Sequence, residues 1–314
     1  MKFVLYGNGE IDYCSEVHHK RSLEALGHEC VILQENKVST DVVLEQSLQA
    51  DALIWIHTHG FKNPGRIPMG QVLTLLKAAG KPTIAYHLDL YRSIKRWQEY
   101  VDSPYFRTEY WFSVDKPMVD LMNEKGWTKA HFIPAGVLEA ECYISTEPSE
   151  HANDVVFVGS KNYHREWDWR PTVINWLRKT YGKRFTHVGG DGDTGTLRGD
   201  ELNRMYANSK VAVGDSLCVG YDYPLYHSDR LWEASGRGGA QVFPLIPGID
   251  QWFKDGEHLK YFRFGDFDSL RSSIDWMLDN DVERERIRLA GHDMVQATGT
   301  YTQRWKTILE TVFL

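Results

Sequence analysis

The chain of 314 residues contains no apolar run near the roughly 20 residues that a membrane-spanning helix requires. It has only four cysteines, which stand far apart without a CxxC pair: Cys14, Cys30, Cys142 and Cys218. This spacing argues against a zinc site or a disulfide framework and favours a reducing, cytoplasmic setting. The first residues, MKFVLYGNGE, lack a small-residue cleavage site, so they predict a first strand and not a signal peptide.

The chain also lacks an excess of positive charge. It has 36 Lys and Arg against 43 Asp and Glu, a formal net charge of −7. Neutralisation of phosphates supplies most non-specific affinity for nucleic acid, so only a local basic groove would suit that class of partner. The dinucleotide fingerprint GxGxxG is absent as well, because Gly7-Asn8-Gly9 has no third glycine, and this argues against an NAD enzyme.

Hydrophobic residues make up 42% of the chain, which is typical of a globular protein, and its length suits two domains of about 150 residues. Short apolar runs alternate with helical stretches, and a polar segment at 145–154 predicts a linker. This order predicts parallel strands covered by helices, in two doubly wound Rossmann-like α/β domains that face a central cleft. The predicted strands are KFVLYG, CVILQ, ALIWIH, PTIAYHL, YWFSV, AHFIPAG, DVVFVGS, RFTHVGG, KVAVGDS and AQVFPLI.

The second half carries five motifs in a fixed order: VFVGS, THVGGDG, RGDELNRMYANSKVAV, HSDRLWEASGRGGAQVFPLIPGIDQWFKDGEHLKYF and TYTQRWKTIL. Taken together, residues 153–312 resemble the second domain of GT-B-fold glycosyltransferases. The resemblance is strongest to the "group 1" set, which includes the CgeB-like proteins of spore maturation. The first half has only a loose similarity to that family, in the segment RSLEALGHECVIL, which resembles the family's opening helix and second strand.

The resemblance implies an enzyme that moves a sugar from a nucleotide-diphosphate sugar to a hydroxyl acceptor, with retention and without a metal or other cofactor. We expect an acceptor-side domain over 1–146, a donor-binding domain over 147–296, and a helix over 297–314 that packs back on the first domain. Many retaining members carry a Glu eight positions before Glu233, where this chain has Leu225. The choice between retention and inversion therefore stays open.

A helix expected to begin near Ser228 carries the first candidate donor residues. The resemblance implies that Glu233 accepts the hydroxyl hydrogens of the donor's ribose. Ser228 and Asp229 are typical capping residues, and the amide groups of a helix N-terminus form a natural pyrophosphate site, which Arg230 would assist. The remaining donor candidates lie in turns after predicted strands: Gly159, Ser160, Lys161, Gly189 and Gly190.

Arg165 lies where the family commonly has a phosphate-binding Lys. A cation there would stabilise the nucleoside diphosphate as it leaves, so Arg165 is a predicted catalytic residue. Asp191-Gly-Asp193 resembles the metal-binding DxD of the other glycosyltransferase fold, GT-A. Because the surrounding pattern is GT-B, we predict no metal there, and we assign Asp266 to a helix cap.

Polar residues that follow strands of the first half are the acceptor-side candidates, because ligands bind at the carboxyl ends of such strands. His87-Leu-Asp89 resembles the family's strand-end His-Asp near the transferred sugar, so both side chains are predicted to be catalytic. A His is suited to accept a proton near pH 7, and Asp89 would act as base or orienter. The remaining residues predicted on the acceptor side are Gly9, His57 and His59.

The acceptor itself stays open among a small metabolite, a glycan, a protein and a hydroxymethylated DNA base. Two short basic stretches, HHKR at 18–21 and SIKRW at 93–97, are compatible with the last of these. Two alternatives keep the same fold. One is a non-catalytic nucleotide- or sugar-binding protein, and the other is a phosphate-dependent or epimerase-type enzyme that uses the donor without a foreign acceptor.

Overall fold

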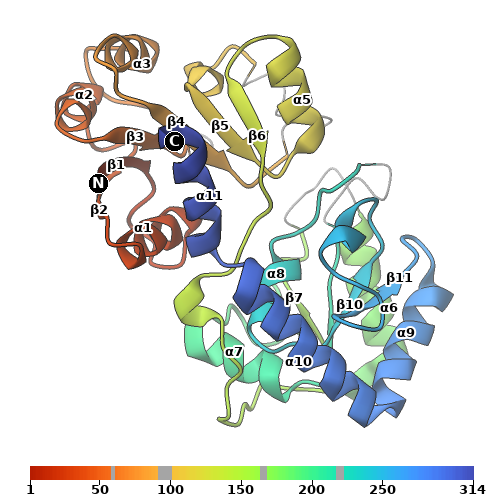
Figure 1. Ribbon diagram of the computed structural model, residues 1–314. Helices are drawn as coiled ribbons and strands as arrows, with labels where there is room; N and C mark the ends of the chain where they lie inside the picture. Colours follow the sequence, from red (N-terminus) through yellow and green to blue (C-terminus); the bar gives the residue numbers. More distant parts are fainter. Residues whose placement is uncertain (58–60, 91–100, 163–167, 217–222) are drawn as a thin grey trace. The chain divides into compact units, whose positions relative to one another are not determined.

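Two compact units make up the structure. The first combines Met1–Ala135 with Tyr301–Leu314, and the second comprises Gly136–Thr300. Each unit has its own parallel β-sheet, which confirms the predicted pair of Rossmann-like α/β domains. The residues described by the computed structural model (Figure 1) are 1–57, 61–90, 101–162, 168–216 and 223–314.

The sheet of the first unit has the strand order β2-β1-β3-β4-β5-β6, and all neighbouring strands are parallel. The order changes direction between β1 and β3, the place at which open α/β sheets bind ligands. The strands are β1 (Lys2–Gly7), β2 (Glu29–Gln34), β3 (Ala52–Trp55), β4 (Thr83–His87), β5 (Tyr110–Ser113) and β6 (Lys129–Phe132). The helices are α1 (Ser15–Ala25), α2 (Thr40–Leu48), α3 (Met69–Ala78), α5 (Lys116–Glu124) and α11 (Tyr301–Phe313), with a 3₁₀ turn η1 (Pro104–Arg107).

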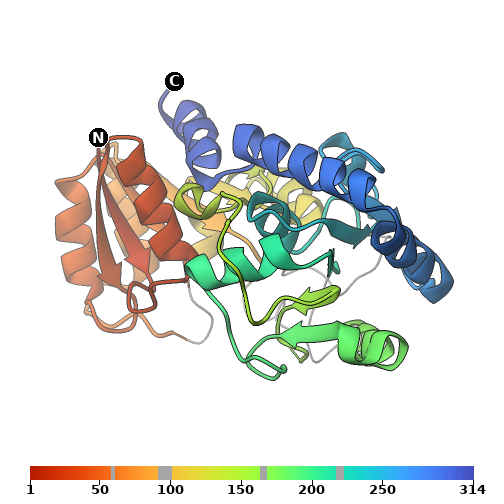
Figure 2. The ribbon, with the colours of Figure 1, turned by 90° about the horizontal axis from the view of Figure 1, so that it is seen from below.

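Helices cover both faces of this sheet (Figures 1 and 2). Apolar residues of α1 and α11 pack on one face, and those of α2, α3 and α5 pack on the other. Trp305 of α11 is fully buried and its Nε1 donates to Nδ1 of His19 on α1 at 3.2 Å. Burial lowers the pKa of His19 to about 3, so this histidine is neutral and serves the core. The last helix is thus part of the first unit's core.

The sheet of the second unit has the order β11-β10-β9-β7-β8, again with parallel neighbours. Its order changes direction between β7 and β9. The strands are β7 (Val155–Val158), β8 (Phe185–Val188), β9 (Val211–Val213), β10 (Gln241–Pro244) and β11 (Lys260–Phe262). The helices are α6 (Trp169–Tyr181), α7 (Gly199–Asn208), α8 (Arg230–Gly236), α9 (Phe267–Asp279) and α10 (Asp281–Thr298), and short 3₁₀ turns are η2 (Glu139–Glu141), η3 (Gly182–Arg184) and η5 (Ile249–Gln251).

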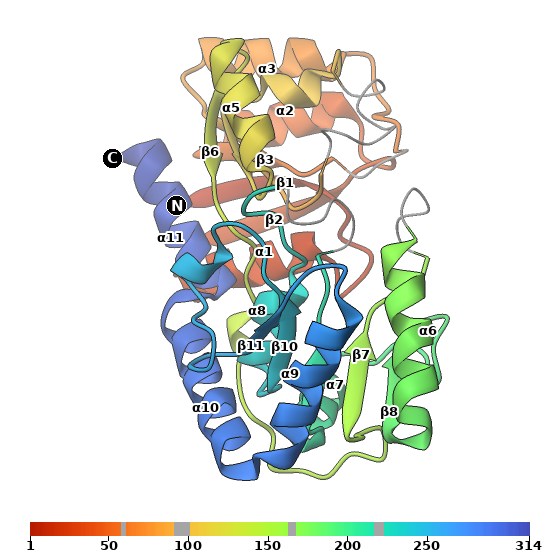
Figure 3. The ribbon, with the colours of Figure 1, turned by 90° about the vertical axis from the view of Figure 1, so that its right-hand side faces the viewer.

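The core of the second unit also has two sides. Apolar residues of α6 and α9 lie together on one face of the sheet (Figure 3), and those of α7 pack on the other. The segment that leads into this unit is bonded to α7, because Asn203 Nδ2 donates to the carbonyl oxygens of Glu141 and Tyr143, both at 2.9 Å. The chain therefore enters the second unit after Ala135, earlier than the predicted division at 146/147.

The strands from β1 to β10 match the segments predicted from apolar runs, and only β2 and β6 begin one residue before them. The three-residue β11 was not among the predicted strands. Asp266 caps α9 as predicted, since its Oδ1 accepts from the Ser269 N–H at 2.8 Å. Among the described residues, no helix has the length and apolar character needed to cross a membrane.

Candidate functional site

Gly159 follows β7 at the point where the strand order of the second unit changes direction. Its φ is +142°, a conformation that favours glycine. A Cβ atom built there would lie 3.2 Å from Nε of Arg230 and 3.3 Å from Nη1 of Arg170. The missing side chain therefore lets two guanidinium groups approach one strand end, in the place where a doubly wound sheet binds phosphate-bearing ligands.

Arg170, on the first turn of α6, is fixed by a buried ion pair. Its Nε and Nη2 donate to the two carboxylate oxygens of Asp215, which follows β9, at 2.7 and 2.9 Å. Nη1 donates to the Ser160 carbonyl oxygen at 3.0 Å. This bidentate pair neutralises Arg170 and holds the loop after β7 in place. Neither Arg170 nor Asp215 was predicted as part of the site.

Arg230 is the second guanidinium beside Gly159. Its Nη1 contacts Asp229 Oδ1 at 3.3 Å and Ser228 Oγ at 3.2 Å, whereas its buried Nε has no hydrogen-bond partner among the described residues. Burial lowers the pKa of Arg230, but the carboxylates of Asp229 and Glu233 outweigh it and raise the pKa above its ordinary value. Arg230 is thus a permanent cation with an N–H group left for a ligand.

The helix that carries Arg230 begins close to the predicted start near Ser228. α8 spans Arg230–Gly236, and the backbone of Asp229 is already helical, with φ −50° and ψ −27°. The Ser228 hydroxyl accepts from the Arg230 N–H at 3.4 Å, as a capping residue does, in addition to its contact with the guanidinium. The Asp229 side chain makes no capping hydrogen bond, so the capping role predicted for Asp229 is wrong.

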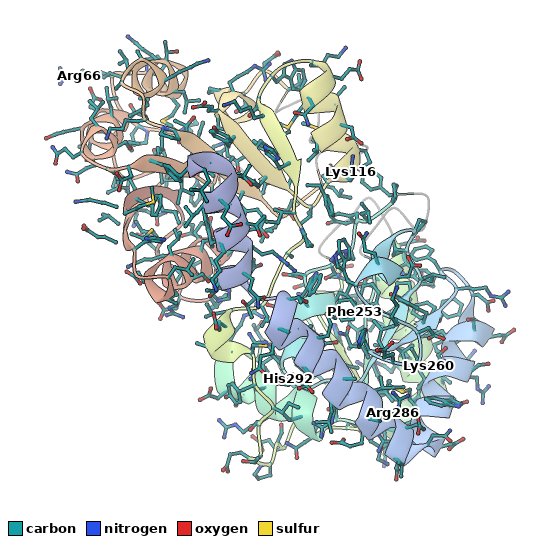
Figure 4. The ribbon with its side chains drawn as sticks, in the orientation of Figure 1. Arg66, Lys116, Phe253, Lys260, Arg286 and His292 are labelled. Carbon is teal, nitrogen blue, oxygen red and sulfur yellow. The ribbon has the colours of Figure 1, made fainter. Side chains whose placement is uncertain are left out.

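Buried hydrogen bonds fix α8 in the second unit. Gln241 Nε2, from β10, donates to the Leu231 carbonyl oxygen at 2.7 Å and to Ser235 Oγ at 2.6 Å. His292, which lies on α10 (Figure 4), has its Nδ1 at 2.9 Å from the Gly236 carbonyl oxygen. Strand β10 and helix α10 thus hold both ends of this short helix, so the side chains that α8 presents have a defined position.

Glu233 lies on α8, one turn after Arg230, and is partly buried. Its carboxylate makes no hydrogen bond or close ion pair with any described residue. Burial is the main cause that raises the pKa of Glu233, and Asp229 adds to it, while Arg237, Arg230 and Arg198 act in the opposite direction. A partly buried carboxylate costs free energy when it has no hydrogen-bond donor. A ligand with hydroxyl or N–H groups would therefore bind favourably to Glu233.

Close packing between strand ends explains why glycine occurs in the turn after β8. A Cβ on Gly189 would lie 2.8 Å from the carbonyl oxygen of Gly159, so this glycine allows the ends of β7 and β8 to approach each other. Gly190 is the next residue of the same turn. Lys161 lies close by, since its backbone N–H donates to Asp191 at 2.9 Å and its Nζ donates to Asn175 Oδ1 at 3.0 Å. These predicted donor residues are thus close to Gly159.

The two carboxylates of the DxD-like pattern bind protein groups. Asp191 accepts from the Lys161 N–H, and Asp193 accepts from Arg178 Nη2 at 2.9 Å and from the His187 N–H at 2.8 Å. These contacts lower the pKa of Asp193 although burial opposes the change. Within the described ranges, no group of three or more His, Cys, Asp or Glu side chains has the arrangement of a metal site.

Two predicted site residues, Arg165 and His59, lie outside the described residues. In the first unit, His87 ends β4 and is buried among aromatic rings, with Nδ1 3.4 Å from Tyr105 Oη and its ring 5.8 Å from that of Trp111. Asp89 is partly buried two residues further on. The surroundings of His87 are those of a packed strand end, and the catalytic roles of His87 and Asp89 stay predictions.

At the carboxyl end of β3, His57 contacts a residue that was not predicted. Its Nδ1 lies against Oε1 of Glu35, a fully buried carboxylate that follows β2. Gly9 lies near the same strand end, where its N–H donates to Gln34 Oε1 at 2.8 Å and a Cβ would lie 2.2 Å from Ile32 Cγ2. Close packing thus accounts for this glycine, and its predicted role toward an acceptor stays a prediction.

Comparisons with known proteins agree with this geometry. The model of the family described as "Glycosyl transferase-like" matches residues 165–310, just under half of the chain and nearly all of it in the second unit. No curated protein matches the chain.

Several solved structures match the whole chain. A glycosyltransferase from Rickettsia africae is similar with a TM-score of 0.62 and 10% identity, over 99% of this chain and 97% of that one. HepE from Anabaena, solved with UDP and glucose, has a TM-score of 0.64 and 12% identity over 99% of both chains. An α-glucosyltransferase, solved with UDP-glucose and DNA that contains an abasic site, has a TM-score of 0.67 and 11% identity over 100% of both chains.

At such low identity the structural likeness establishes the fold, which is the two-domain GT-B fold. The family match adds the class of activity for the unit that contains Gly159, Arg230 and Glu233. Together they place this chain among the glycosyltransferases of the GT-B fold, enzymes that use nucleotide-sugar donors. Membership of the CgeB-like set, predicted from the motif order, does not follow from these matches and stays a prediction.

Proposed function

We propose that this protein transfers a hexose from a nucleoside-diphosphate sugar to a hydroxyl acceptor, and that its second unit holds the donor. The observation that carries this proposal is the carboxylate of Glu233. It is partly buried, lacks a hydrogen-bond donor among the described residues, and shares α8 with the cation Arg230. A ribose offers two adjacent hydroxyl donors, and a diphosphate offers the anionic oxygens that a guanidinium binds.

The donor site we propose has three parts. Glu233 accepts from the ribose hydroxyls, and Arg230 donates Nε to the diphosphate beside the open backbone of Gly159. The loop of Ser160 and Lys161, anchored by Arg170, lies next to this position. As the diphosphate leaves, its negative charge grows, so a fixed cation stabilises the transition state more than the ground state.

UDP-glucose is the first donor to test, because several similar structures were solved with UDP or UDP-glucose. Retention of configuration and independence from a metal also belong to the proposal. The contacts that Asp191 and Asp193 make with protein groups support metal independence, whereas Leu225 removes one argument for retention. Product analysis by proton NMR distinguishes the two anomers.

A glycan, a small molecule and a hydroxymethylated DNA base remain the acceptors of this proposal, with the first unit as the acceptor side. The similarity to an α-glucosyltransferase that was solved with DNA makes glucosylation of modified DNA worth a direct assay. The net charge of −7 argues for a local contact with DNA over a broad one.

The binding experiment uses isothermal titration calorimetry with UDP, and a hydrolysis assay follows release of glucose from UDP-glucose. We expect wild-type protein to bind UDP and to hydrolyse the donor slowly without an acceptor. Binding without hydrolysis would favour the non-catalytic nucleotide-binding alternative. For the predicted catalytic residues, Arg165→Ala should lower kcat more than it raises the donor KM, and Asp89→Asn and His87→Ala should slow transfer while UDP binding is unchanged.

A further inference from the structure

A pocket of about 580 Å³ lies at the amino edge of the sheet of the first unit. Thr83, Glu109 and Lys129 line it, and these residues lie at or just before the starts of β4, β5 and β6. Residues of α3 and η1 form further parts of its wall. Ligands of doubly wound sheets bind at the carboxyl ends of the strands, and the five residues of β4 separate the two edges by about 16 Å. This pocket is therefore distinct from the site described above.

Two cations of this pocket have no acidic partner among the described residues. The charged residues that line it are Lys77, Arg107, Lys129 and Glu109. Glu109 pairs with Lys129, since Nζ of the lysine lies 3.0 Å from Oε1 of the glutamate. Lys77 and Arg107 are exposed, and neither forms an ion pair with any residue that the structure describes. The pocket thus has a local excess of positive charge in a chain whose net charge is −7, and this excess favours an anionic ligand.

Arg107 is oriented by its neighbours although its side chain is exposed. The guanidinium carbon lies 4.5 Å from the centre of the Trp127 ring, and Nη1 donates to the Phe106 carbonyl oxygen at 3.2 Å. The guanidinium makes no other hydrogen bond with a described residue, so further N–H groups are left for a ligand. Because a guanidinium is planar, it can bind two oxygens of one carboxylate or phosphate group at once.

The other groups that line the pocket suit a sugar ring. Trp127 is partly exposed, and an indole offers an apolar face to the C–H groups of a sugar. Thr74, on α3, is exposed, and its Oγ1 donates to the Gly70 carbonyl oxygen at 2.9 Å, so the same oxygen can accept from a sugar hydroxyl. The volume of about 580 Å³ also lies within the range of about 300–1,000 Å³ that is usual for small-ligand sites.

We propose that this pocket binds a sugar that carries a carboxylate or phosphate group. Arg107 and Lys77 bind the anionic group, and the sugar ring lies beside Trp127 and Thr74. The inference rests on the proposed function and deepens it, because it assigns the acceptor to the acidic or phosphorylated glycans. The binding itself needs only residues of the first unit, and no covalent bond forms or breaks in this pocket.

Isothermal titration calorimetry with the full chain tests this binding. The probes are trigalacturonic acid for the carboxylate, glucose 6-phosphate for the phosphate, and maltotriose as the neutral sugar. We expect one of the two charged sugars to bind at least about tenfold more tightly than maltotriose, because only a charged sugar uses the two cations. The charged sugar that binds identifies the anionic group, and its affinity should fall with added salt because the cations are exposed.

Single substitutions test whether the two cations make the contact. Arg107→Gln and Lys77→Gln should each weaken binding of the preferred charged sugar by about tenfold, because each variant loses one charged contact. Lys306→Gln is the matched control, since it removes one exposed positive charge from α11, on the other face of the same sheet. This control should keep the affinity within twofold of wild type, and urea unfolding verifies that all three variants fold.

Absence of binding by both charged sugars, or equal affinity for maltotriose, would overturn the proposal. An affinity that is unchanged in both Arg107→Gln and Lys77→Gln would do the same, because the sugar would then bind elsewhere. Equal affinity for inorganic phosphate would assign the pocket to simple anions, and tighter binding of oligothymidylate that is lost in the same variants would assign it to DNA. None of these assays uses the donor, so wild-type protein that binds UDP but hydrolyses no UDP-glucose would contradict the proposed function and not the binding of a charged sugar.

Discussion

Replacement of Glu233 by Gln should make the protein more stable and a weaker binder of the donor. Burial and Asp229 raise the pKa of Glu233 above its ordinary value of 4.5. A carboxyl group whose pKa is raised in the folded state stabilises the fold at a pH below the unfolded value, and that contribution is lost as the pH rises through the folded value. At pH 7 Glu233 therefore lowers the free energy of unfolding relative to acidic pH, and Gln removes this cost.

The loss of donor affinity can be estimated from the number of hydrogen bonds that Glu233 accepts from the ribose. Two ribose hydroxyls that donate to one carboxylate contribute about 1.5–3 kcal/mol in total, which corresponds to a roughly 10- to 100-fold weaker affinity for UDP in Glu233→Gln. Calorimetry with UDP measures this change, and urea unfolding at pH 7 and pH 4 measures the stability. We expect a gain in stability at pH 7 that shrinks toward pH 4.

The control for this prediction is Glu147→Gln, because Glu147 is an exposed residue of the same unit. This variant should change neither UDP affinity nor the pH dependence of stability. The reasoning about Glu233 would be refuted by a Gln variant that binds UDP as wild type does. A Gln variant that is less stable than wild type at pH 7 would refute the electrostatic part alone.

Three further predictions concern the strand ends of the second unit. Gly159→Ala should lower stability by about 1–3 kcal/mol and also weaken UDP binding, because it forces a side chain into a φ of +142° beside Arg230; unchanged urea unfolding would contradict this. Asp215→Asn should cost about 3–5 kcal/mol in urea unfolding, since it leaves Arg170 buried without its charge partner, and a loss below 1 kcal/mol would show that the pair matters little. Hydrolysis of UDP-glucose should persist in EDTA, and activity that returns only with Mn²⁺ or Mg²⁺ would show that the carboxylate of Asp193 binds a metal and not only Arg178.

Local sequence patterns were sufficient to predict the architecture, and together with the family resemblance they singled out two residues of the proposed donor site. Parallel strands buried on both faces read as short apolar runs, so each strand from β1 to β10 could be found without knowing its neighbours. Gly159 and Glu233 were found through motifs that lie within a single strand–turn or helix. The capping role of Asp229 was predicted wrongly, because Asp229 has the residue type of a helix cap but a backbone that is already helical.

The pairs that hold the site in place could not be predicted in the same way. Arg170 and Asp215 are 45 residues apart and join α6 to the end of β9, whereas Glu35 and His57 are 22 apart and join the ends of β2 and β3. Which strand ends become neighbours depends on the strand order, and the sequence pattern leaves that order undetermined. Buried contacts of this kind therefore become visible only in the folded structure.

The central claim is that this protein breaks the bond between a sugar and a nucleoside diphosphate, and that Glu233 holds the donor while it does so. The most direct test follows release of glucose and UDP from UDP-glucose, without an acceptor, for wild-type protein and Glu233→Gln over a range of donor concentrations. We predict slow turnover by wild type and a KM at least tenfold higher for the variant. Absence of turnover by wild-type protein that binds UDP, or equal KM values for the two proteins, would contradict the account.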